Sequence, residues 1–299
     1  MLINQLSGWQ TELPYAFVSK VSKKNTYTKN ILNIFFPFLN FMFNNTKKGD
    51  YNLIVGKKVV PLHTFKEKSL KMQKQVIAEH ISSVWQDLTV EQLQLITDSI
   101  NVKEIKKNSM IYDAGDIPEQ MAFVFEGKVK IYKNTPGNRC QILRIAQAGD
   151  FFGYRAYLVG EPHSSSASAF ENCLLAFIPL PVLDRLMREN HNVTMYIIKV
   201  LARQLGKSDQ RTIDLTQKHL RGRLAESLLL LKERYGVGED GVTINISLTR
   251  EDLANMSNMT TSNAIRTLSN FSATKLIATD GRKIKLLRED ELRKISKLG

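Results

Sequence analysis

The sequence LTREDLANMSNMTTSNAIRTLSNFSATKLIATDGRKIKLL, residues 248–287, decides how the C-terminal part of the chain folds. Thr249 can cap a helix, and Asp252 follows it at the three-residue spacing that is typical of a helix start. The turn at residues 257–259 leads to Thr260, which can cap a second helix. This order predicts a helix, a tight turn and a second helix.

A β-hairpin is expected directly after the second helix. Residues 276–279 and 283–287 are mostly apolar segments on either side of a turn that contains Asp280-Gly281. An Asp-Gly pair between two such segments is a frequent hairpin turn. The hairpin would form a wing beside the two helices, so we expect residues 216–299 to be a winged helix-turn-helix domain.

Two further patterns precede this domain. Residues 105–178 contain short β-rich runs separated by glycine turns, which is typical of an antiparallel β-sandwich or barrel, with a short helix capped by Thr89 before them. Residues 182–215 carry apolar side chains at spacings of mostly three, four or seven, which predicts one long helix. Gln204 and Ser208 interrupt its apolar seam, a pattern more typical of a coiled-coil dimer contact than of a strut between domains.

Composition limits the possible classes of protein. The chain has 299 residues, enough for about two domains, and no apolar stretch reaches the ~20 residues that cross a bilayer, which excludes a membrane channel subunit. Two cysteines are too few for a disulfide framework, and the five histidines lack the spacing of metal ligands. We therefore expect a cytoplasmic protein with no cofactor and no metal. The net charge of +13 suggests a polyanionic partner, although the bulk excess alone is weak evidence for DNA binding.

The first 71 residues differ in composition from the rest of the chain. They contain 11 Lys and three acidic residues, and all 15 Arg of the chain lie beyond them. We expect residues 1–71 to be an extension that is poorly ordered or not native, with Met72 as the natural start. A real accessory segment and a membrane-surface anchor are the alternatives. The β-rich domain is then expected at residues 72–215, with its long helix at about 182–215.

Taken in order, these elements resemble the Crp/Fnr family of bacterial transcription regulators over about residues 80–295. The resemblance rests on residues 248–287, on GDFFG at 149–153 in the β-rich region, and on RGRLA at 221–225 after the long helix. This ordered combination is far more specific than a helix-turn-helix alone. The resemblance implies an α+β fold with an antiparallel, jelly-roll-like β-roll as effector domain, a long dimerisation helix, and a C-terminal winged helix-turn-helix.

The resemblance also implies a function. We expect a sequence-specific, homodimeric regulator of transcription, not an enzyme, which binds double-stranded DNA and contacts RNA polymerase, with a small-molecule effector still to be identified. The alternative is a cyclic-nucleotide-binding signalling module without DNA contact. That alternative would need an intact nucleotide-binding cassette and no helix-turn-helix, and the sequence has the reverse of both.

The second helix of the quoted stretch can enter a major groove. It offers short polar side chains on its first turn and Arg266 one turn later on the same face, and the basic residues near the wing suit phosphate contacts. The candidate DNA-binding residues are Arg250, Thr260, Thr261, Ser262, Asn263, Arg266, Lys275, Arg282 and Lys283. The alternative is that the threonines only cap the helix and Arg266 is only solvated. Family members often carry Arg-Glu where this chain has Thr261-Ser262, so we expect this chain to bind an operator that differs from theirs.

The cyclic-nucleotide cassette of the family is altered in this sequence. Tyr154 stands where the family has the Glu that holds the ribose, and His163, or Ser164 in an ungapped match, stands where it has the Arg that holds the phosphate. A neutral histidine lacks the guanidinium fork, so we expect an effector other than cyclic AMP. The candidate pocket residues are Phe152, Gly153, Tyr154, Arg155, His163, Ser164, Ser165 and Ser208. We favour a partly exposed His163 without a ligand, and Arg155 either in an internal ion pair or on the effector.

Overall fold

The computed structural model describes residues 52–55, 58–135 and 139–298 of the chain. The chain divides into two compact units, Met1–Met72 and Gln73–Gly299. Most of the expected extension, residues 1–51, lies outside the described residues, so its predicted disorder stays a prediction.

In the first unit the described elements are a short hairpin and the beginning of a helix. Strand β1 (Asn52–Val55) pairs antiparallel with β2 (Lys58–Pro61), and α3 (Leu62–Trp85) follows directly. Helix α3 continues through Met72 without interruption. No helix or strand therefore begins at the residue that we expected to be the start of the protein.

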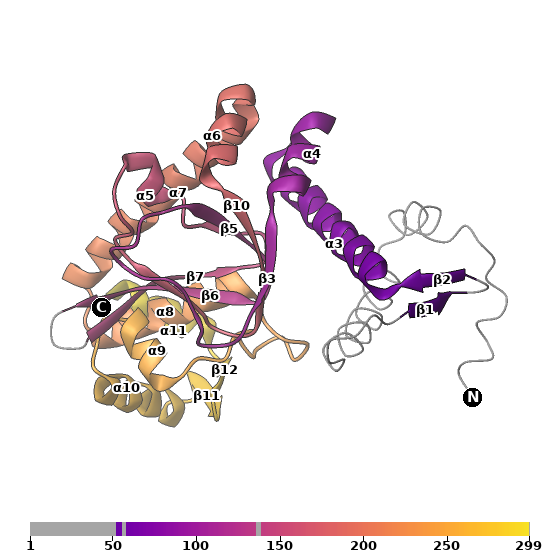
Figure 1. Cartoon of the computed structure of the whole chain (residues 1–299). Coiled ribbons are helices and arrows are strands. Elements are labelled where there is room, and N and C mark those ends of the chain that lie inside the picture. Colours follow the sequence, from indigo (N-terminus) through magenta and orange to yellow (C-terminus); the bar gives the residue numbers. More distant parts are fainter. Residues whose placement is uncertain (1–51, 56–57, 136–138, 299) are drawn as a thin grey trace. The chain divides into compact units, whose positions relative to one another are not determined.

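The second unit contains two four-stranded antiparallel sheets that enclose a common core (Figure 1). One sheet has the order β3 (Asn101–Ile105), β10 (Cys173–Pro179), β5 (Gln120–Glu126) and β8 (Phe151–Phe152). The other has the order β4 (Met110–Tyr112), β9 (Ser166–Ala169), β6 (Lys128–Thr135) and β7 (Arg139–Gln147). Apolar side chains from both sheets, such as Val124 and Val129, are fully buried between them. The predicted β-roll is thereby confirmed.

Helices cover the outer face of the first sheet. Helix α4 (Val90–Ser99) begins with the predicted cap, since the Thr89 side chain accepts a hydrogen bond from the Gln92 backbone N–H. The end of α3 packs into the core between these helices and the first sheet, where Trp85 stacks on Phe151 with ring centroids 5.0 Å apart. This layer anchors the effector domain on the N-terminal side.

The single long helix that the sequence predicted is two helices in the structure. Helix α6 (Leu180–Glu189) ends at Asn190, and α7 (His191–Gln217) begins there. The Asn190 side-chain oxygen accepts hydrogen bonds from the backbone N–H groups of Asn192 and Val193, at 2.9 and 3.4 Å. An asparagine that caps a new helix in this way adopts extended backbone angles, which interrupt the preceding one. The predicted long helix is confirmed in α7, whereas its continuity over residues 182–215 was wrong.

The C-terminal elements form the winged helix-turn-helix that the sequence predicted. They are α8 (Leu220–Tyr235), α9 (Arg250–Met256), α10 (Thr261–Ala273), β11 (Ile277–Asp280), β12 (Lys283–Leu286) and α11 (Glu289–Leu298). Thr249 and Asp252 form a capping box at α9, and Thr260 caps α10 by accepting from the Asn263 N–H at 3.2 Å. Both predicted caps are confirmed.

Strand β7 belongs to the β-roll and to the winged-helix core at the same time. Ile142 and Ile145 are buried against apolar residues of α8 to α11, which lie beside β6 and β7 in Figure 1. The register with β6 shifts so that Ile131 faces Arg144 and Tyr132 faces Ile142, which leaves Leu143 as the extra residue of a β-bulge. A bulge changes the phase of a strand, so two side chains three positions apart can face the same side. Because of the bulge, Ile142 and Ile145 both point toward the winged helix, whereas Arg144 points away from it.

Candidate nucleic-acid interface and effector pocket

Helix α10 has one buried face and one exposed polar face. Ala264, Leu268 and Phe271 are buried in the winged-helix core, whereas Thr261, Ser262 and Arg266 are exposed. This alternation follows the helical period, and it is what leaves the predicted reading residues free on the surface.

Two of these residues contact one another. The Arg266 guanidinium donates a hydrogen bond to the Asn263 side-chain oxygen at 3.0 Å, one turn earlier. The bond holds the long arginine side chain along the exposed face of α10. A partner would therefore meet a partly ordered guanidinium.

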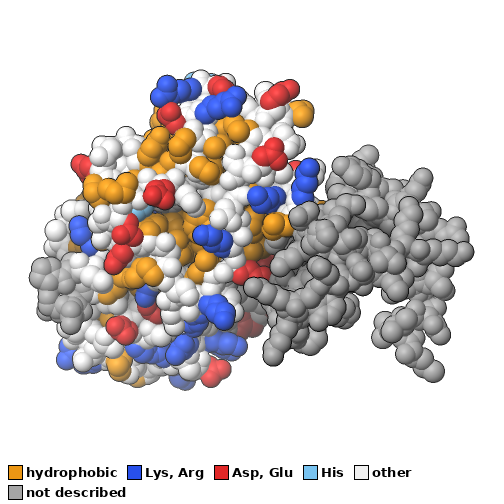
Figure 2. All heavy atoms as spheres, viewed as in Figure 1, with side chains coloured by type: hydrophobic (Ala, Val, Ile, Leu, Met, Phe, Trp, Pro, Cys, Tyr) orange, Lys and Arg blue, Asp and Glu red, His pale blue; other side chains and the backbone are white. Residues whose placement is uncertain are grey.

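The basic residues around the wing differ in their exposure and in their hydrogen bonds. Lys275, Arg282 and Lys283 are exposed, and Figure 2 shows Lys and Arg side chains gathered along the lower edge of the molecule, where the winged-helix elements lie in Figure 1. Arg250 is partly buried and donates to the Gly281 carbonyl at 3.0 Å. Arg250 thus connects the start of α9 to the turn of the wing, a contact that the sequence did not indicate.

The candidate effector residues lie mostly together in one pocket of the β-roll. Phe152, Gly153, Tyr154 and Arg155 at the end of β8 and the start of α5 (Arg155–Val159) meet the segment 163–165 there. Gly153 has φ +88°, and a Cβ atom at this position would lie 3.2 Å from the Gln120 carbonyl oxygen, so a glycine is needed. Ser208 is exposed on α7 and does not line the pocket within this chain.

The pocket is nearly filled by the side chains of the protein. Its volume is about 40 Å³, and Tyr154 is only 1% exposed. Burial raises the pKa of Tyr154 and raises that of Tyr112, which also lines the pocket, to about 12, so both phenols stay protonated. Aromatic side chains leave little free space in the pocket.

His163 is buried, and the prediction of a partly exposed histidine was wrong. Its imidazole stacks on Tyr112, with ring centroids 3.9 Å apart and an interplanar angle of 11°. Backbone hydrogen bonds connect it to Gly115 and Asp116, which fixes its loop against the turn that follows β4. Burial lowers the pKa of His163, although Asp116 opposes this shift, so the ring is neutral near pH 7.

Arg155 is exposed, and no ion pair joins it to another described residue, so the internal ion pair that we considered for it is absent. Four residues that line the pocket were not predicted from the sequence: Tyr112, Ile131, Arg144 and Ala156. The charged one, Arg144 of β7, is partly buried. The charge of Arg144 among Ile142, Leu143 and Ile145 was the available signal. The pocket thus contains two arginines, neither at the position where the family has its phosphate-binding arginine.

Hydrogen bonds connect the β-roll directly to the winged helix. The Arg211 guanidinium of α7 donates to the Ile142 and Leu143 carbonyls at the bulge, at 2.8 and 3.0 Å, and to the Met256 carbonyl at 3.1 Å. On the other side, Arg234 of α8 forms an ion pair of 2.5 Å with Asp150. These contacts hold α9 and α8 against β7.

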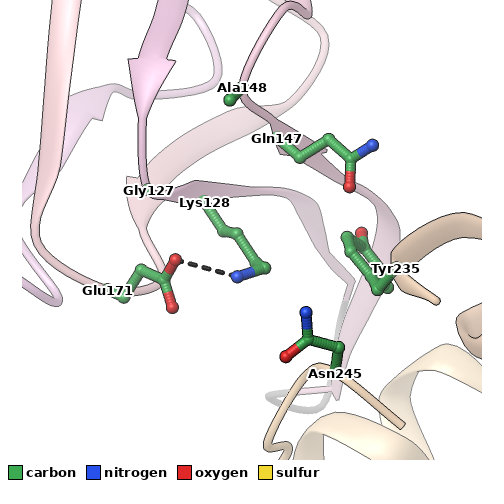
Figure 3. A pocket seen from close by; sticks show the side chains of 7 residues that line it. All are labelled: Gly127, Lys128, Gln147, Ala148, Glu171, Tyr235 and Asn245. Atoms are coloured by element: carbon green, nitrogen blue, oxygen red, sulfur yellow. Dashed lines mark hydrogen bonds and ion pairs between the residues drawn. The ribbon is translucent and has the colours of Figure 1, made fainter. Parts of the chain in front are cut away.

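A larger cavity of about 330 Å³ lies at the same junction (Figure 3). Lys128 and Glu171 form an ion pair of 2.9 Å at its edge, and Gln147, Tyr235 and Asn245 line the rest. The Tyr235 hydroxyl donates to the Ile145 carbonyl at 2.9 Å, so it is already engaged. This cavity has no free buried charge and is a less defined site than the pocket of the β-roll.

The described part of the chain has neither a cluster of metal ligands nor a membrane-spanning helix. Among these residues, no group of three or more His, Cys, Asp or Glu side chains could hold a metal ion. None of the described helices is both long enough and apolar enough to cross a membrane.

Comparison with known proteins gives two domain matches. The family described as "Cyclic nucleotide-binding domain" matches residues 102–190, and the "Crp-like helix-turn-helix domain" matches residues 222–295. The two ranges coincide with the β-roll and with the winged helix.

Relatives and solved structures match over both domains. A "Fumarate and nitrate reduction regulatory protein" of Vibrio cholerae is 26% identical over 65% of this chain and 78% of its own, and a "CRP-like cAMP-activated global transcriptional regulator" of Mycobacterium tuberculosis is 22% identical over 71% and 95%. The structure of FixK2 from Bradyrhizobium japonicum superposes with a TM-score of 0.60 at 22% identity, over 66% of this chain and 96% of that one. A regulator from Eubacterium rectale gives 0.59 at 20% identity, over 72% and 97%.

Proposed function

The chain belongs to the Crp/Fnr family of transcription regulators, and from this membership we propose that it is a homodimer that reads a two-fold-related DNA site with one α10 from each subunit. The β-roll serves as its effector domain, and RNA polymerase is the expected partner on DNA. The protein works in the cytoplasm and carries out no catalysis.

The observation that carries this proposal is the exposed face of α10. A helix capped by Thr260 and packed through Phe271 presents Ser262 and Arg266 to solvent. Hydroxyl and guanidinium groups at this spacing can donate to base edges in a major groove. Lys275, Arg282 and Lys283 then contact phosphates and set the register of the domain on the duplex.

Dimerisation through α7 is supported by its uncovered apolar side chains. Ile198, Leu205 and Ile213 are 49, 64 and 45% exposed on this helix. Their spacing of seven and eight residues places them along one side of a helix. A second copy of α7 would cover this stripe as in a coiled coil.

The effector pocket supports a ligand other than cyclic AMP. Sites for ligands of that size usually enclose ~300–1,000 Å³, whereas this pocket has about 40 Å³. Neutral, buried His163 cannot pair with a cyclic phosphate, and buried Tyr154 cannot accept from a ribose as a carboxylate does.

Selection of bound sequences from random DNA by the purified protein tests the proposal. We expect enrichment of a palindromic site whose half-sites are about one helical turn, ~34 Å, apart, together with a dimer in light scattering. No enriched sequence, combined with saturable binding of a cyclic nucleotide, would instead favour the signalling module without DNA contact.

A further inference from the structure

The pocket of the β-roll contains positive charges without matching negative ones. Its lining includes Arg144 and Arg155, and no Asp or Glu is among the described residues that line it. No ion pair joins either guanidinium to another described residue. Both arginines lower the pKa of Tyr112 and of Tyr154, which indicates that their fields meet in the same small space.

Arg144 is the unusual member of this pair. It is partly buried, burial lowers its pKa, and the one hydrogen bond of its guanidinium to a described residue is that to the Phe151 carbonyl, at 2.9 Å. A cation removed from water is costly unless a counter-charge and further acceptors compensate for it. In the protein alone this compensation is incomplete.

Asp150 cannot supply the missing counter-charge by itself. It is the carboxylate with the largest effect on Arg144, but it lies outside the pocket lining. Its Oδ2 atom already lies 2.5 Å from Arg234 and accepts from the Gln147 backbone N–H at 2.9 Å. One negative charge is thus shared between two arginines, which leaves the pocket side of Arg144 open to an anion.

We propose that this pocket binds a small oxyanion, such as inorganic phosphate, sulfate or a short carboxylate, between Arg144 and Arg155. The inference rests on the proposed role of the β-roll as effector domain and names the ligand class of that site. A volume of about 40 Å³ corresponds to about three water-sized groups at ~10–15 Å³ each, which suits an anion of a few heavy atoms. Ser164 and Ser165 line the same pocket and can donate their hydroxyls to the remaining oxygens.

The two arginines have different tasks in this site. Arg144 is carried by a strand and held by the Phe151 carbonyl, so its fork is preorganised for a bidentate contact. Arg155 is exposed at the start of α5 and can fold over the anion from the solvent side. We therefore expect Arg144 to contribute more to affinity.

Isothermal titration of the full-length protein with phosphate, sulfate and acetate, each at constant ionic strength in chloride, tests the inference. At least one of these anions should bind saturably at one site per chain. Arg144→Gln should weaken anion binding about tenfold or more, and Arg155→Gln should weaken it by less. The anion affinity of Arg144→Lys should lie between those of Arg144→Gln and the wild type, because lysine keeps the charge but lacks the guanidinium fork. The matched control is Arg185→Gln on α6, which removes an exposed arginine paired with Glu189 and should leave binding unchanged.

DNA binding by the same preparations separates this inference from the proposed function. Wild-type protein that selects DNA but binds none of the three anions at millimolar concentration would overturn the inference and leave the function intact. Equal anion binding by the wild type and Arg144→Gln would also overturn it, provided that their thermal unfolding transitions agree. A wild-type protein that selects no DNA would overturn the proposed function, whatever it binds in the β-roll.

Discussion

The exposed face of α10 and the pocket of the β-roll use polar side chains in opposite ways. On α10, Ser262 and Arg266 face solvent on a helix whose backbone is already capped. In the pocket, Tyr154 and His163 are buried and occupy the space themselves. The first surface is ready for a partner, whereas the second must rearrange for any ligand much larger than an inorganic ion.

This difference shows where control of the protein can act. A ligand in the β-roll does not need to build the reading helix, because the helix is complete without it. In the proposed dimer it would need to change how the two copies of α10 are placed relative to one another. We expect the contacts of β7 with α8 and α9 to be the physical route for that.

The largest expected effect comes from separating the two copies of α10. Leu205→Glu places a charge on the apolar stripe of α7, so the dimer should dissociate and affinity for a two-half-site operator should fall ~100-fold or more. Sedimentation and fluorescence anisotropy on the same samples measure both. Lys207→Glu changes charge two positions away, on another side of the helix, and should remain dimeric; if it dissociates as well, the stripe is not the interface.

A smaller effect is expected from the reading face itself. Arg266→Ala should lose ~1–3 kcal/mol of binding free energy on the selected site and relax the base preference, because we propose that its guanidinium reads base edges. Lys283→Ala should weaken binding to all sequences alike, because we propose that Lys283 contacts a phosphate. It should also lower the slope of log affinity against log salt concentration by about one. Competition titrations with selected and random DNA distinguish the two, and equal losses on both DNAs for Arg266→Ala would contradict base reading.

The helix caps test whether the reading unit is preformed. Thr249→Ala removes the capping box with Asp252 and should lower the free energy of unfolding by ~0.5–2 kcal/mol, as measured by urea denaturation. Thr249→Ser keeps the hydroxyl and serves as the matched control. If both variants unfold like the wild type, the cap does not stabilise α9.

The smallest effect is expected from removing the N-terminal segment. A chain that begins at Met72 retains every buried residue of the effector core from Ile77 onward, so its affinity for DNA should stay within about threefold of the full chain. Anisotropy with the selected operator measures this directly. Loss of solubility, or a tenfold loss of affinity, would assign a role to residues 1–71.

Sequence patterns predicted the features that depend on neighbours in the chain. The caps at Thr89, Thr249 and Thr260 are local, because each side chain bonds to the backbone three residues later. The burial of His163 depends instead on Tyr112, and the position of Arg144 depends on a bulge against β6; both are set by pairing across the β-roll. Spacing within one segment carries no information about such partners.

The bulge at Leu143 also has a consequence for how the gene can change. In this part of β7, Arg144 lines only the pocket, and Ile142 and Ile145 lie only in the winged-helix core. Substitutions can therefore alter ligand choice and domain contact separately. An inserted or deleted codon in this strand would exchange the two sides, since a shift of one residue reverses every side chain. Descendants of this gene should diverge in residue type along β7 while keeping its length constant.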